Sequence, residues 1–197
     1  LEHWGIDDGS NIYLCCQNLF KVHPDFDKVL QEIIELDASS LIVFFQGRED
    51  AWYQPLRNRW NKLIGPMSRR IIFLPRQNFP MFLELVQHAK VILDTLHITG
   101  GNTTFQCLGL SQPIVTLPGK NLKSRITAAA YKQMGFESLI AKDADDYVRL
   151  AVRLATDHAF ASAVRQRIGE RSNILFTNSK SIDEWQNFFV QAVNQAM

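Results

Sequence analysis

The chain has 197 residues, 46% of them hydrophobic, and a formal net charge of +1 at pH 7. This length suits one domain with a sizeable core, and the small net charge gives no electrostatic reason to expect nucleic acid or a membrane as a partner. Apolar runs such as residues 41–45 are too short to span a bilayer, and no signal-like segment begins the chain, so we expect a cytoplasmic protein. The three cysteines lack CxxC spacing and indicate neither a disulfide framework nor a zinc site.

Short apolar runs alternate with longer amphipathic ones, which is typical of a Rossmann-like α/β fold, a parallel sheet with helices on both faces. Strands are predicted at residues 12–16, 40–45, 70–74, 91–94, 113–117 and 138–140, and the helices between them at 25–36, 50–64, 80–88, 103–110 and 124–134. Beyond residue 143 the pattern predicts a helical tail, with helices at 144–157, 160–171 and 181–195 that should pack against the sheet. No linker-like segment divides the chain, so residues 1–197 are expected to form a single domain.

The segment 94–104 has the pattern of a phosphate site. An apolar strand leads through Gly100 and Gly101 into a predicted helix start that carries Asn102, Thr103 and Thr104. Glycines let the backbone approach an anion, and the amides and dipole at the start of a helix attract negative charge. The same pattern also fits a strand, a glycine turn and a capped helix without any ligand.

Polar segments follow several of the predicted strands, at residues 17–21, 46–50, 76–82, 97–104 and 119–125. In an open parallel sheet, ligands bind outside the carboxyl ends of the strands, near the point where the strand order reverses. These five loops are therefore the candidate site. The first of them lacks the GxGxxG sequence of a dinucleotide fold, which disfavours a nicotinamide or flavin cofactor.

Three segments occur in a characteristic order: residues 13–24, residues 93–104, and residues 113–119 followed by Ser124 and Arg125. Together they resemble the C-terminal lobe of O-GlcNAc transferases, above all of the bacterial SPINDLY type, and the resemblance covers essentially the whole chain. It implies the nucleotide-sugar-binding lobe of a GT-B glycosyltransferase, a metal-independent enzyme that transfers sugar to protein Ser or Thr. The family's N-terminal catalytic lobe and TPR repeats are not in this sequence. We therefore expect a fragment that is inactive alone and meets its acceptor protein through the missing half.

The resemblance assigns the contacts with the diphosphate. Lys21 aligns with the lysine that stabilises the departing diphosphate and is the expected catalytic residue, although by itself it would read as a solvated surface lysine. Gln17 and Asn18 can donate hydrogen bonds beside it. At the start of the following helix, the expected diphosphate ligands are Gly101, Asn102, Thr103 and Thr104.

The resemblance also implies a base pocket near Arg76 and Gln77, where the family reads the pyrimidine through backbone groups. Phe82 could stack on the base or belong to the core. Arg125 could reach the phosphates or the sugar, or form an ion pair with Asp94 or another carboxylate. Asp94 is otherwise expected to fix the glycine loop.

Two departures from the family leave the donor open. Gln106 stands where a carboxylate usually holds the ribose, and Phe79 and Phe82 stand where animal members carry a lysine and a histidine. The expected donor is UDP-GlcNAc or another UDP-sugar, with GDP-fucose as the other candidate. No metal is expected, because the candidate loops show no Asp, Glu and His residues at ligand spacing. The alternative is a non-catalytic nucleotide-binding or protein-interaction domain of the same fold, which Gln106 favours.

Overall fold

The computed structural model describes residues 1–47, 50–177 and 179–196, so part of the predicted loop 46–50 lies outside the described residues. Five parallel strands, β1 (Asn11–Cys15), β2 (Ser40–Phe45), β3 (Ile71–Leu74), β4 (Val91–Leu93) and β5 (Ile114–Val115), form a sheet in the order β3-β2-β1-β4-β5. The first three strands proceed towards one edge, and the chain then crosses back to place β4 on the other side of β1. The strand order therefore reverses between β1 and β4, which brings the loops after these two strands together.

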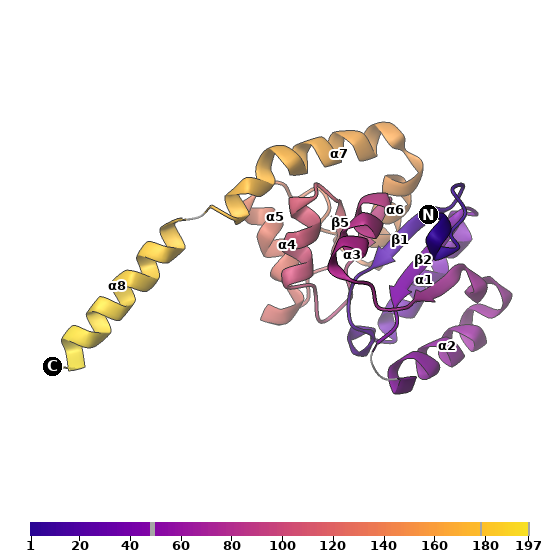
Figure 1. Cartoon of the computed structure of the whole chain (residues 1–197), viewed down its shortest axis with the longest axis horizontal. Coiled ribbons are helices and arrows are strands. Elements are labelled where there is room, and N and C mark those ends of the chain that lie inside the picture. The colour runs from indigo at the N-terminus through magenta and orange to yellow at the C-terminus, as the bar shows by residue number, and fades with distance from the viewer. Residues whose placement is uncertain (48–49, 178, 197) are drawn as a thin grey trace.

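Helices flank this sheet (Figure 1). The connecting helices are α1 (Asp25–Leu36), α2 (Asp50–Ile64), α3 (Phe79–His88) and α4 (Asn102–Gly109). Crossovers between parallel strands are right-handed, so the direction of a crossover decides which face its helix covers. Helices α1 and α2 lead from β1 towards β3, and α3 and α4 lead back towards β5. The two pairs of helices therefore lie on opposite faces of the sheet. The later helices are α5 (Ile126–Gln133), α6 (Ala144–Thr156), α7 (His158–Arg171) and α8 (Ser179–Ala196). The prediction of a parallel sheet with helices on both faces is confirmed.

Local periodicity explains the best-predicted elements. In α1 the buried residues recur at helical spacing, at Phe26, Val29, Leu30, Ile33 and Ile34, and form one apolar stripe against the sheet. The bounds predicted for α1, α2 and β2 are confirmed, and most other elements differ from prediction by one to three residues at an end.

The predicted strand 138–140 is wrong, and β5 is shorter than the predicted 113–117. Ile140 makes only an isolated parallel bridge to Thr116. The Tyr131 hydroxyl accepts a hydrogen bond from the Ile114 amide and donates one to the Ile114 carbonyl, both at 2.9 Å. These are the backbone groups that a neighbouring strand would need, so the side chain closes this edge of the sheet.

The prediction that the whole helical tail packs against the sheet is correct for α6 and wrong for α8. Helix α6 contacts α1, β1 and β4, and α7 packs on α6. Helix α8 points away from the rest of the protein (Figure 1). Its large apolar side chains are between 54% and 67% exposed: Ile182, Trp185, Phe188, Phe189, Val190 and Val193. Among the described helices, none is both long enough and apolar enough to cross a bilayer.

Candidate functional site

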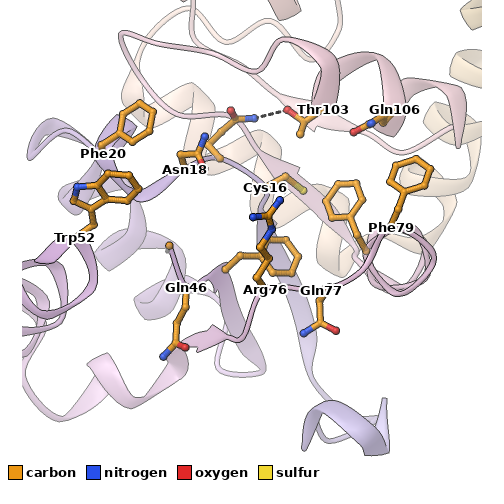
Figure 2. Close-up of a pocket in the computed structure, with 14 residues that line it drawn as sticks. Cys16, Asn18, Phe20, Gln46, Trp52, Arg76, Gln77, Phe79, Thr103 and Gln106 are labelled. Atoms are coloured by element: carbon orange, nitrogen blue, oxygen red, sulfur yellow. Dashed lines mark hydrogen bonds between the residues drawn. The ribbon is translucent and has the colours of Figure 1, made fainter. Parts of the chain in front are cut away.

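A pocket of about 580 Å³ opens at the carboxyl ends of β1, β2 and β3 (Figure 2). Its volume lies within the range of small-molecule sites, roughly 300–1,000 Å³. The structure brings together in its lining several residues that the sequence had assigned to donor binding, namely Gln17, Asn18, Arg76, Gln77, Phe82, Thr103 and Gln106. They come from the loops after β1 and β3 and from the helices α3 and α4.

Lys21 does not line this pocket but lies directly behind Gln17. Its Nζ donates hydrogen bonds to Gln17 Oε1 at 2.8 Å and to the Thr99 carbonyl at 3.1 Å. Gln17 Nε2 in turn donates to Thr103 Oγ1 at 2.9 Å, the bond drawn in Figure 2. These bonds join the loop after β1 to the loop after β4, where the strand order reverses.

Lys21 is half-buried, and burial lowers the pKa of its ammonium group below the ordinary value, while Asp94 and Cys15 act in the opposite direction. An ammonium group has three N–H donors, and the two bonds above use two of them. Within the described part of the chain the third donor has no hydrogen-bond partner, so it can contact an anion.

Asp94 holds the glycine loop, as predicted. Its buried carboxylate accepts hydrogen bonds from the Gly100 amide and from the Thr116 hydroxyl, each at 2.9 Å. Burial is the largest influence on its pKa and raises it, and the hydrogen bonds from neighbouring groups oppose that shift. The Asp94 carboxylate makes no ion pair with Arg125 in the described part of the chain.

Gly100 is the glycine that this geometry requires. A Cβ there would overlap Thr104 Oγ1, would lie 2.8 Å from Gln17 Nε2, and would lie 3.1 Å from Thr103 Oγ1. The backbone at Gly100 therefore approaches the side chains of the candidate diphosphate site more closely than any other residue type would allow.

The remaining predicted residues lie outside the pocket lining. Gly101 is the residue before α4, and the exposed Asn102 is its first residue. The buried Thr104 hydroxyl is bonded to Thr127 Oγ1 at 2.9 Å, so it faces the interior. The exposed Arg125 donates from Nε to the Gly119 carbonyl at 2.7 Å, which orients its guanidinium along its own loop.

Aromatic side chains form much of the pocket wall, and the sequence placed only Phe79 and Phe82 among them at the site. Phe82 lines the pocket and also packs against Phe45, with ring centroids 5.8 Å apart, so it is both a wall residue and a core residue. Phe20 and Trp52 meet edge to face at 5.3 Å on another part of the lining. Phe20 is 57% exposed and Trp52 is 37% exposed. The sequence did not indicate them as site residues, because hydrophobic periodicity does not show which aromatic side chains are exposed.

The structure brings together a histidine–carboxylate cluster of which only His97 lies in a predicted candidate loop, 97–104, while His23 and Asp25 lie just beyond the loop 17–21. His23 and Asp25 follow β1, His97 follows β4, and one potential ligand atom from each lies within 4.8 Å of the others. The sequence hides this cluster because His97 lies 72 positions from Asp25. None of the three residues lines the pocket described above.

The fold of this chain resembles parts of two solved structures. The Thermobaculum terrenum O-GlcNAc transferase K341M mutant superposes with a TM-score of 0.83 at 19% identity, over 98% of this chain and 39% of the other. The Neisseria meningitidis UDP-GlcNAc 2-epimerase bound to UDP-GlcNAc superposes with a TM-score of 0.58 at 14% identity, over 87% and 44%.

Sequence comparison shows the family itself. A UDP-N-acetylglucosamine–peptide N-acetylglucosaminyltransferase from Caenorhabditis elegans is 35% identical over 167 residues, which is 83% of this chain. The chain spans only 14% of that relative's length. The sequence profile of glycosyl transferase family 41 matches residues 1–182. The chain therefore belongs to glycosyl transferase family 41.

Proposed function

We propose that this chain is the donor-binding lobe of a metal-independent glycosyltransferase that moves a sugar from a nucleotide sugar to Ser or Thr of an acceptor protein. The proposal rests on the hydrogen bonds that join Lys21 to Gln17 and Gln17 to Thr103. These bonds lie where the strand order of the sheet reverses, beside a pocket large enough for a nucleotide. The Caenorhabditis elegans relative is named as a UDP-N-acetylglucosamine–peptide N-acetylglucosaminyltransferase, which supports UDP-GlcNAc as the first donor to test. Other UDP-sugars and GDP-fucose remain the competing donors.

The diphosphate is assigned to the space beside Thr103 and the start of α4. When the bond between the sugar and the diphosphate breaks, the diphosphate oxygen takes the electron pair and becomes more negative. The remaining N–H donor of Lys21 and the positive end of the α4 dipole would stabilise that charge. Because these groups favour the departing diphosphate, they would assist transfer without a metal ion at the phosphates.

The base is assigned to the wall formed by Phe79 and Phe82 beside Gln77, where a ring can stack and the backbone can read a pyrimidine edge. Gln106 lies three residues after Thr103 on the same face of α4, and both line the pocket. This position suits a contact with the ribose. The acceptor protein would approach through the other lobe of the enzyme, which these 197 residues do not include.

A second function has one observation in its favour. No carboxylate occurs among the described residues that line the pocket, so the ribose would lack a charged acceptor. A non-catalytic domain of the same fold would tolerate that loss. Titration with UDP separates the proposed function from a protein-interaction domain, since such a domain has no reason to bind a nucleoside diphosphate.

Gln106→Glu should tighten the binding of UDP, because a carboxylate accepts stronger hydrogen bonds from ribose hydroxyls than an amide does. The expected gain is on the order of 1 kcal/mol, the scale of one hydrogen bond. Isothermal titration calorimetry on both forms measures it.

The matched control for Gln106→Glu is 2′,3′-dideoxy-UDP, which offers no hydroxyl to either side chain. The gain should be absent with this ligand. An equal response to both ligands, or no response to either, would remove Gln106 from the ribose site and strengthen the non-catalytic alternative.

The affinity for UDP should depend on the charge of Lys21. Because burial lowers the pKa of Lys21 and only the protonated form attracts the diphosphate, affinity should be full below that pKa. The affinity should fall as the pH rises through the pKa of Lys21, and this fall should occur at a lower pH than for an ordinary lysine. Above about pH 7 the phosphate itself no longer titrates, since its second pKa is about 6. Calorimetry from neutral to alkaline pH should show a larger fall in the wild type than in Lys21→Ala, where only the base of the nucleotide still loses a proton; an equal fall in both forms would exclude Lys21 as its cause.

A further inference from the structure

Two imidazoles and one carboxylate converge on the surface next to the proposed donor site. His97 Nε2 lies 2.8 Å from Asp25 Oδ2, and His23 Nδ1 lies 3.3 Å from the same oxygen. The two imidazole rings are edge to face, with centroids 4.6 Å apart. All three side chains are exposed, so an ion could enter directly from solvent.

We propose that His23, Asp25 and His97 bind a divalent transition-metal ion, with Zn²⁺ as the preferred species. Zinc binds imidazole nitrogen at about 2.0–2.1 Å and carboxylate oxygen at about 2.0–2.2 Å, so ligand atoms on a tetrahedral ion lie roughly 3.3 Å apart. The two contacts with Asp25 Oδ2, at 2.8 and 3.3 Å, are slightly shorter than that spacing and equal to it. The third pair, His23 and His97, needs only a small ring movement, which exposed side chains allow.

The donor set determines which ion fits. Imidazole nitrogen suits Zn²⁺, Co²⁺, Ni²⁺ and Cu²⁺, whereas Mg²⁺ and Ca²⁺ prefer oxygen ligands in greater number. Three protein ligands leave a coordination position for water. The site is thus a transition-metal site rather than a partner for the diphosphate in the manner of Mg²⁺.

The metal site would fasten the two loops that form the proposed donor site. Asp25 begins α1 after the β1 loop, and His97 precedes Thr99, whose carbonyl accepts the bond from Lys21. An ion held by His97 and Asp25 would therefore join the same loops from the outer side. Since none of the three ligands lines the pocket, nucleotide binding itself would not require the ion.

Calorimetric titration of ZnCl₂ into the chelator-treated 197-residue chain tests the proposal without any nucleotide. One Zn²⁺ should bind per chain. His97→Asn and His23→Ala should each weaken binding by at least about tenfold, since each removes one of three ligands. Asparagine is chosen at position 97 because His97 has a left-handed φ of 69°, which Asn tolerates better than most residues. The exposed His158 lies outside the cluster and provides the control His158→Ala, which should bind zinc as the wild type does.

Absence of zinc binding to the wild type would overturn the proposal. So would a zinc affinity that both His97→Asn and His23→Ala leave unchanged, since the ion would then belong to other ligands such as the cysteine thiols. Bound Co²⁺ gives a second readout, because its visible absorption should appear in the wild type and in His158→Ala and be lost in His23→Ala. Circular dichroism on each variant verifies that it is folded, and His23→Ala, an exposed substitution, keeps the test decisive if His97→Asn fails to fold.

Discussion

Replacing Lys21 with alanine should weaken the binding of UDP by about 1.5–3 kcal/mol, or roughly 10- to 150-fold in Kd, the range for a hydrogen bond to a charged group. The ammonium group is half-buried and already bridges Gln17 and the Thr99 carbonyl, so it is held in place before the nucleotide arrives. Its loss also frees Gln17, which positions Thr103. Calorimetry with UDP measures the change.

Lys28→Ala is the matched control for Lys21→Ala. It removes the same charge from a side chain that is 72% exposed and pairs with Glu32 at 3.3 Å along α1. Such a surface pair contributes little, so this variant should bind UDP as the wild type does. If Lys21→Ala and Lys28→Ala give the same Kd, Lys21 is a solvated surface lysine and the proposed diphosphate site loses its cation.

Gly100→Ala should damage both stability and nucleotide binding. The added methyl group would overlap Thr104 Oγ1 and crowd Gln17 Nε2 at 2.8 Å, so the side chains of the site must move apart. Overpacking of this kind costs about 1–3 kcal/mol in the free energy of unfolding. Because Gln17 and Thr103 are the displaced groups, the affinity for UDP should also fall, by roughly tenfold, the equivalent of one lost hydrogen bond.

Gly9→Ala is the corresponding control, since a Cβ there meets nothing closer than Asp7 Oδ1 at 3.8 Å. Urea unfolding and UDP calorimetry on the two variants give the comparison. A Gly100→Ala protein with wild-type stability and wild-type affinity would show that the loop has more room than the structure indicates, and that it does not shape the diphosphate site.

The sequence predicted the fold wherever local patterns determine it. Apolar residues such as Phe26, Leu30 and Ile33 recur on one face of α1, and its bounds were predicted to the residue. Prediction failed where a distant group decides the outcome. Residues 138–140 have the composition of a strand, but the Tyr131 hydroxyl already occupies the Ile114 backbone groups at that sheet edge.

Helix α8 shows a related limit of periodicity. Its apolar residues, among them Trp185 and Phe189, indicate an amphipathic helix, and the helix is present. The pattern does not specify which surface covers that face. In this structure the face is exposed, and α8 points away from the sheet (Figure 1).

The site residues could be predicted from the sequence mainly because the sequence resembles the family. By chemistry alone Lys21 is a surface lysine, and only its place in residues 13–24 assigned it to a diphosphate. The structure adds what no local pattern contains, namely the bonds that join Lys21 to Gln17 and Thr99. The cluster of His23, Asp25 and His97 was missed for the same reason, because strand order alone brings residues 72 positions apart into contact.

The central claim is that this chain binds a nucleoside diphosphate without a metal ion. The most direct test is calorimetric titration of UDP, and of GDP in parallel, into the 197-residue chain with and without EDTA. We expect one UDP per chain and the same Kd in both buffers, because the proposed diphosphate ligands are an ammonium group, side-chain donors and helix amides. Absence of saturable binding of either nucleotide, or binding that disappears when EDTA is added, would contradict the claim.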